Sequence, residues 1–153
     1  IFKRCFMRAI NIIAGLIYIL FVAMPVFALN QQELAETKNK ALAGDIIAQV
    51  DLGDYYDGQN CQEALKWYKM AAEQGQFDAR MRIATYYVFG RCDGKIERNI
   101  LKGYVLYSKI QQQYTLYPES QKALDKQILD LEQELTAEQL QEAEKQINMP
   151  WSF

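Results

Sequence analysis

Residues 63–90 read EALKWYKMAAEQGQFDARMRIATYYVFG, and this stretch decides the fold. On either side of Gly75, apolar and small residues recur three and four positions apart, which is the spacing of one helix face. Gly75 and the earlier Gly44 each stand one step past a predicted helix end, where a left-handed residue is needed. The stretch therefore predicts two short amphipathic helices joined at a glycine.

The same plan occurs just upstream, where residues 42–58 read LAGDIIAQVDLGDYYDG. The run LGDYY (52–56) aligns with IATYY (83–87), and ALKWYK (64–69) aligns with GYVLYS (103–108). The second copy is longer because of GRCDGKIERNI (90–100), between its two helices. A single helix pair cannot bury its apolar stripe, whereas stacked copies build one continuous core. The sequence predicts an all-α protein, a short right-handed solenoid of antiparallel helix pairs.

The residues of these copies resemble the Sel-one-like repeat (SLR) family, which belongs to the tetratricopeptide-like solenoids. The run WYKMAAEQG (67–75) is the most specific part of the match, and the second copy has Gly103 and Leu106 where alanine and tryptophan are expected. The resemblance covers roughly residues 41–110 by the usual repeat lengths. The matching positions are Leu52, Gly53, Tyr56, Gly58, Ala64, Trp67, Tyr68, Ala71, Ala72, Glu73, Gln74, Gly75 and Ala79, then Ile83, Ala84, Tyr87 and Gly90.

The resemblance and the periodicity together give an organisation along the chain. Residues 29–44 are predicted to be an N-terminal helix from a degenerate half repeat, 45–75 the first repeat and 76–114 the second. Residues 117–153 are predicted to form capping helices and a tail, with a capping box from Thr136 to Gln139 at the last helix. We expect the apolar Trp151 and Phe153 to pack back on the last helix, with an exposed apolar tail as the alternative.

The first 28 residues have the pattern of an export signal. Lys3, Arg4 and Arg8 precede an apolar run, and small residues at Val26 and Ala28 predict cleavage after Ala28. An uncleaved anchor over residues 10–29 is the alternative, because that segment is about long enough to span a bilayer. Either form predicts a periplasmic or secreted protein, with a membrane contact only through an uncleaved leader.

Composition excludes several classes of function. The chain has no histidine, which excludes His-dependent triads and His-ligated metal sites. Its net charge of −2, without a basic run, argues against a nucleic-acid partner. The carboxylates of Asp51, Asp54 and Asp57 are three residues apart on a helix, but no nucleophile or cleft accompanies them. We therefore expect no enzyme activity, no cofactor and no metal.

Cys61 and Cys92 fall in the connectors of adjacent repeats, at the same edge of the predicted solenoid. Neighbouring helices lie about 8–10 Å apart, and flexible connectors can close the remaining gap. In an oxidising compartment this predicts a Cys61–Cys92 disulfide, with two free thiols as the alternative. Their spacing does not match the within-repeat disulfides of cysteine-rich SLR proteins.

The first helix of each pair should line a concave face, which in such solenoids commonly binds peptides or proteins. With Leu52, Tyr56, Ile83 and Tyr87 inward, their neighbours should point into the groove, and tyrosine and arginine are the residue types that anchor interfaces. The alternative is that these tyrosines complete the core edge and the charges are solvated. The predicted protein-binding residues are Asp51, Asp54, Tyr55, Arg82, Thr85 and Tyr86.

These observations favour a non-enzymatic exported scaffold or adaptor that binds another protein or peptide. The resemblance implies a sharper form, an immunity-type protein that neutralises a periplasmic toxin. Two alternatives remain: a secreted factor that engages host proteins, and a cell-envelope hydrolase of the cysteine-rich SLR kind.

Overall fold

The computed structural model describes residues 31–91 and 94–153, and the predicted leader (1–28) lies outside them. Within these ranges the regular structure is helical, apart from one antiparallel bridge between Arg91 and Ile96. None of the described helices has the length and hydropathy required to span a bilayer. The chain divides into Ile1–Asn39, of which residues 31–39 are described and helical, and Lys40–Phe153, to which all the following applies.

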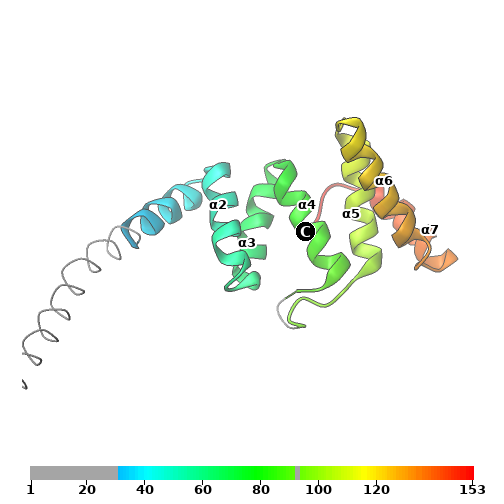
Figure 1. Ribbon diagram of the computed structural model, residues 1–153, viewed down its shortest axis with the longest axis horizontal. Helices are drawn as coiled ribbons and strands as arrows, with labels where there is room; N and C mark the ends of the chain where they lie inside the picture. The colour runs from blue at the N-terminus through cyan, green and yellow to red at the C-terminus, as the bar shows by residue number, and fades with distance from the viewer. Residues whose placement is uncertain (1–30, 92–93) are drawn as a thin grey trace, which may run out of the picture. The chain divides into compact units, whose positions relative to one another are not determined.

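The larger unit is a succession of helices (Figure 1). The pairs α2–α3 and α4–α5 lie within 45–75 and 76–114, and α6 and α7 lie within 117–153. The bounds are α2 (Ile46–Asp57), α3 (Cys61–Glu73), α4 (Phe77–Phe89), α5 (Ile100–Gln113), α6 (Pro118–Glu132) and α7 (Ala137–Ile147).

Side chains fix where most of these helices begin. At each such N-terminus the capping side chain accepts a hydrogen bond from a backbone N–H of the first turn, which satisfies a donor the helix leaves unpaired. α6 instead begins with Pro118, whose missing N–H costs nothing there. Thr136 and Gln139 form the predicted capping box on α7. The capping residues are Asp45, Asn60, Gln76, Asn99 and Thr136.

Gly75 ends α3 as the sequence predicts. Its φ is +93°, in the left-handed region, and its N–H donates to Ala72 O at 3.0 Å. The next N–H, of Gln76, donates to Ala71 O at 3.1 Å, which completes a Schellman motif. This turn reverses the chain from α3 into α4 and so sets the stacking of the second pair on the first.

The core is built from the predicted helix faces. Trp67, Tyr68 and Ala71 of α3 are buried, as are Ile83 and Ala84 of α4. Consecutive helices pack from α2 to α6, and α7 packs on α5. The core therefore runs through the stacked pairs and ends beneath α6 and α7, which cover the open face of α5.

Two glycines inside helices allow close helix packing. A Cβ at Gly53 of α2 would stand 2.3 Å from the Tyr68 ring, and one at Gly103 of α5 would stand 2.5 Å from Val88 Cγ2. Real side chains do not approach so closely. Gly103 thus explains why this repeat departs from the alanine expected there: α5 lies too close to α4 for a side chain.

Candidate protein-interaction face

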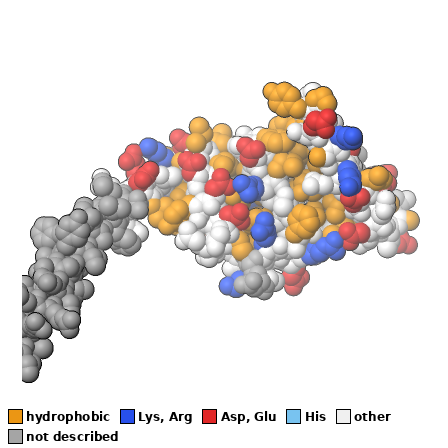
Figure 2. Space-filling view, in the orientation of Figure 1, with side chains coloured by type: hydrophobic (Ala, Val, Ile, Leu, Met, Phe, Trp, Pro, Cys, Tyr) orange, Lys and Arg blue, Asp and Glu red, His pale blue; other side chains and the backbone are white. Residues whose placement is uncertain are grey.

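The candidate face lies on α2 and α4, the first helices of the two pairs. Arg82 of α4 extends to α2, where its guanidinium nitrogens lie 3.4 Å from Asp54 Oδ1 and 3.8 Å from Asp57 Oδ2. Acidic and basic side chains accordingly alternate over this region of the surface (Figure 2). Because the Arg82 and Asp54 side chains are about half exposed, this pairing positions side chains more than it stabilises the fold.

Two buried tyrosines donate hydrogen bonds from the core to the carboxylates of this face. The Tyr68 hydroxyl donates to Asp54 Oδ1 at 2.6 Å, and the Tyr86 hydroxyl donates to Asp57 Oδ1. Burial raises the pKa of both phenols above its ordinary value, and the hydrogen bonds to the carboxylates raise it further. Both hydroxyls therefore remain protonated donors at neutral pH, and Asp54 and Asp57 are held in fixed orientations.

The structure corrects the predicted position of Tyr86. Its side chain is 1% exposed and its ring packs edge-on against Tyr68, with centroids 6.0 Å apart, so it belongs to the core and does not point into a groove. Tyr87, which was predicted to be inward, is only half-buried. The reason is that α4 lies between α3 and α5, so its buried face is wide enough to include the position three residues after Ile83.

Thr85 is also turned away from the predicted groove. Its hydroxyl donates to Met81 O at 2.9 Å and shares a 2.9 Å hydrogen bond with the Tyr107 hydroxyl of α5. Thr85 is half-buried and joins α4 to α5. It does not lie with Arg82 on the exposed face.

The remaining predicted residues are accessible. Tyr55 is 44% exposed and its ring packs edge-on against Tyr56, with centroids 5.0 Å apart. Asp51 is exposed one turn earlier on α2. We define the α2–α4 face as Asp51, Asp54, Tyr55, Asp57 and Arg82.

Sequence reasoning missed Asp57 and Tyr68 as parts of this arrangement. The spacing of Asp54 and Asp57 indicated two carboxylates on one helix side, but it did not show that Arg82 joins both. Tyr68 was assigned to the core, and it is buried there. Its hydroxyl nevertheless extends from α3 to the carboxylate of Asp54 at the surface of α2. Such contacts depend on helix stacking and leave no signal in the spacing.

Cys61 begins α3 and is disulfide-bonded. Cys92, its predicted partner, lies outside the described residues, so the Cys61–Cys92 pairing stays a prediction. In the described part of the chain, no group of three His, Cys, Asp or Glu side chains could hold a metal ion.

A comparison with solved structures finds a protein of similar helical architecture. This is the crystal structure of a protective antigen present in uropathogenic Escherichia coli strains, which displays an SLR fold. The two agree with a TM-score of 0.60 and 24% sequence identity over 74% of this chain. The chain has an SLR fold. The predicted all-α solenoid of helix pairs is thereby confirmed.

The SLR fold is shown by this likeness and by the helix pairs, while the match covers only 24% of the neighbour's length. The chain thus corresponds to about a quarter of that protein. No protein-family model and no curated protein matches the chain. In the SLR fold observed here, the first helices of the pairs carry the ordered charges of the α2–α4 face.

Proposed function

We propose that this chain is an exported, non-enzymatic scaffold that binds another protein through the α2–α4 face. One observation carries the proposal: Asp54, Asp57 and Arg82 are held in place by each other and by two buried phenols, next to an exposed Tyr55. Side chains that are fixed before binding lose less conformational entropy on binding. Tyrosine and arginine are also enriched among the residues that dominate binding energy.

The same geometry argues against the alternative that the protein is a cell-envelope hydrolase. Asp54 and Asp57 are each engaged by a phenol and by Arg82, which is typical of a structural ion-pair cluster. Carboxylate-based hydrolysis needs two acids with separate roles across a cleft. A cavity that the described residues do form lies elsewhere, between α5 and α7.

Export is part of the proposal and rests on the leader pattern in residues 1–28. The SLR-fold neighbour is a protective antigen, which favours a location that a host can reach. A host protein and a periplasmic toxin are the two partner classes that we propose. Finding a toxin gene beside the gene for this chain would favour the immunity-type role.

The test is a capture experiment followed by reconstitution. The tagged full chain is expressed with its leader in the native host, gently cross-linked and purified, and the dominant bound protein is identified. That protein is then produced separately and its Kd is measured by calorimetry. We expect Asp51→Ala/Tyr55→Ala to weaken binding at least about tenfold, the effect of losing about 1.4 kcal/mol.

The matched control is Tyr117→Ala, which removes a tyrosine that is exposed at the start of α6, away from the α2–α4 face. It should leave the Kd unchanged. Equal binding by Asp51→Ala/Tyr55→Ala and the unaltered chain would show that the partner uses another surface. Absence of any enriched partner would remove the scaffold proposal for that host.

A further inference from the structure

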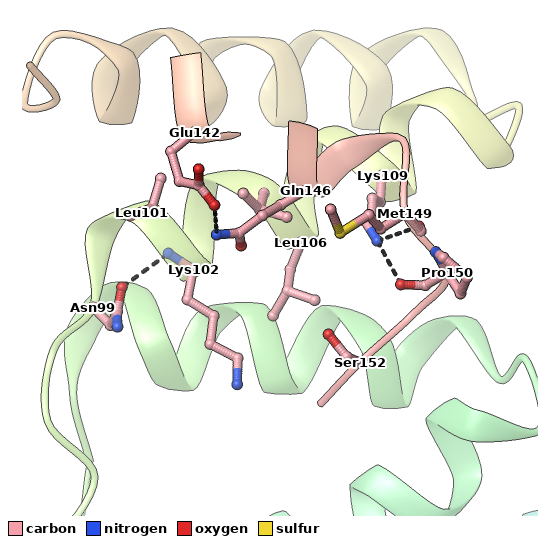
Figure 3. Close-up of a pocket in the computed structure, with 11 residues that line it drawn as sticks. Asn99, Leu101, Lys102, Leu106, Lys109, Glu142, Gln146, Met149, Pro150 and Ser152 are labelled. Carbon is pink, nitrogen blue, oxygen red and sulfur yellow. Dashed lines mark hydrogen bonds between the residues drawn. The ribbon is translucent and has the colours of Figure 1, made fainter. Parts of the chain in front are cut away.

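The segment after α7 is already docked on the protein like a short peptide. After Ile147 the chain leaves the helix, and residues 149–153 run back over α5 towards α4 (Figures 1 and 3). Trp151 and Phe153 pack against the core cluster, and their rings stack with centroids 5.4 Å apart. The sequence predicted that they pack but placed them on the last helix, whereas Trp151 contacts Arg80 of α4 and Gln113 of α5. We call residues 149–153 the tail.

The side chain of Lys109 on α5 binds the backbone of the tail. Its Nζ donates to Met149 O at 2.7 Å and to Pro150 O at 3.0 Å (Figure 3). The side chain is 5% exposed, and among the described residues it makes no ion pair with a carboxylate. Burial, followed by the nearby Arg80 charge, lowers the pKa of Lys109. The buried ammonium thus depends on main-chain carbonyls, which any extended segment can supply.

Arg80 of α4 forms the other half of the seat. Its Nε donates to Ala72 O, and its Nη1 donates to Gln113 Oε1 at 3.0 Å and to the Tyr114 hydroxyl at 2.8 Å. These contacts hold the guanidinium over the indole of Trp151, with Arg80 Cζ 4.0 Å from the ring centroid. None of these three partners belongs to the tail. The guanidinium is therefore positioned by residues outside the tail.

Trp151 completes the contact by donating from Nε1 to Gln113 Oε1 at 2.8 Å. We call Arg80, Lys109, Gln113 and Tyr114 the tail seat. The seat recognises two consecutive carbonyls, then an indole that both stacks and donates. This is a more specific pattern than apolar packing of a loose end.

The tail does not fill the space over α5. A cavity of about 410 Å³ remains between α5, α7 and the tail, and Met149, Pro150 and Ser152 line it from the tail side (Figure 3). On the side of this cavity the tail has no protein atoms to pack against, so fewer contacts hold it in place. Met149 is 59% exposed, so the segment has few apolar contacts at its start.

We infer that the tail seat is a second peptide-binding site, whose ligand is an extended segment of a partner that places a tryptophan against Arg80 and two preceding carbonyls on Lys109. The tail is its intramolecular competitor. A tethered segment acts at an effective concentration of the order of millimolar, so an outside segment must bind more tightly or arrive when the tail is displaced. The site is separate from the α2–α4 face and does not depend on the proposed function.

The test uses the full chain and a fluorescein-labelled peptide of residues 148–153, Asn-Met-Pro-Trp-Ser-Phe, which contains the tail. The Trp151→Ala/Phe153→Ala chain, which cannot fill its own seat, should bind the peptide at least about tenfold more tightly than the unaltered chain does. Adding Lys109→Met to that variant should abolish the gain. So should a peptide with alanine in place of its tryptophan.

A second measurement avoids dependence on the folding of the variant. The unaltered chain has two tryptophans, Trp67 and Trp151, whose indole N–H signals are separate probes in ¹H–¹⁵N spectra. Unlabelled peptide at millimolar concentration should shift the Trp151 signal and leave that of the buried Trp67 in place. An unmoved Trp151 signal, together with equal peptide binding by variant and unaltered chain, would overturn the inference. If the unaltered chain were a dimer that the peptide dissociates, the inference would also be overturned. The tail would then be exchanged between two copies of the chain.

Discussion

Gly103 of α5 lies directly against Val88 of α4: a Cβ at Gly103 would stand 2.5 Å from Val88 Cγ2 and 3.3 Å from the Val88 backbone nitrogen. This contact sets the distance between α4 and α5 in the second helix pair. It also turns an apparent departure from the repeat pattern into a packing requirement. A glycine at this position offsets its poor helix propensity by letting α5 approach α4.

Substituting this glycine should therefore destabilise the fold. Gly103→Ala gains about 1 kcal/mol of helix propensity but forces a methyl group against Val88, and such overpacking costs about 1–3 kcal/mol. We expect a net loss of about 1 kcal/mol in urea unfolding. Gly58→Ala is the matched control, because Gly58 has φ −86° and nothing within 4 Å of its added Cβ. The control should be neutral or slightly stabilising, and an equal loss in both variants would contradict the packing argument.

Two tyrosines at equivalent positions of the two repeats should differ in how much their truncation costs. Tyr86→Ala removes a ring that is 1% exposed, together with the hydrogen bond to Asp57, and should cost about 3–5 kcal/mol. Tyr55→Ala removes an exposed ring and should change stability by less than about 0.5 kcal/mol. Thermal and urea unfolding of both variants measure this. If Tyr55→Ala were the more damaging change, the assignment of Tyr86 to the core and of Tyr55 to the surface would be wrong.

The buried phenols predict a loss of stability in alkali. The pKa values of Tyr68 and Tyr86 are raised in the fold above the ordinary value of about 10. Their contribution is complete below about pH 10, where both states are protonated, and it declines above, because the unfolded chain then binds fewer protons. Unfolding free energies from pH 8 to 12 should fall less steeply in Tyr68→Phe/Tyr86→Phe than in the unaltered chain. Parallel curves would show that these phenols are not the alkaline-sensitive groups.

Much of the fold could be predicted because its determinants are local. Gly75, Thr136 and the apolar stripe of α3 act within a few residues of themselves, so spacing alone indicates their roles. The position of Tyr86 could not be read in this way. A single stripe with i, i+4 spacing predicts Tyr87 inward, whereas α4 is packed on both sides and buries a wider face.

The contacts of the candidate sites are non-local in the same sense. Arg82 joins Asp54 and Asp57 across two helices, and Arg80 and Lys109 meet a tail that lies far along the chain. The sequence indicated that Trp151 and Phe153 would pack, since both are large and apolar. It placed them on the last helix and not on α4 and α5, because a charged Arg80 and Lys109 carry no apolar signal.

In the connector of the second repeat, the two partners of the Arg98–Glu134 ion pair should differ in how much their removal lowers stability. Arg98 Nη2 lies 2.9 and 2.8 Å from the two Glu134 carboxylate oxygens, and Arg98 Nε also donates to Val88 O near the end of α4 at 2.9 Å. Both side chains are about half exposed, so Glu134→Ala should cost only about 0.2–1 kcal/mol and less in high salt. Arg98→Ala also leaves a helix-end carbonyl without its partner, which adds about 1 kcal/mol that salt does not screen. Urea unfolding of both single variants and the double variant at 0.1 and 1 M NaCl separates the two contributions. Equal losses for the single variants at both salt concentrations would show that the hydrogen bond to Val88 does not hold the connector.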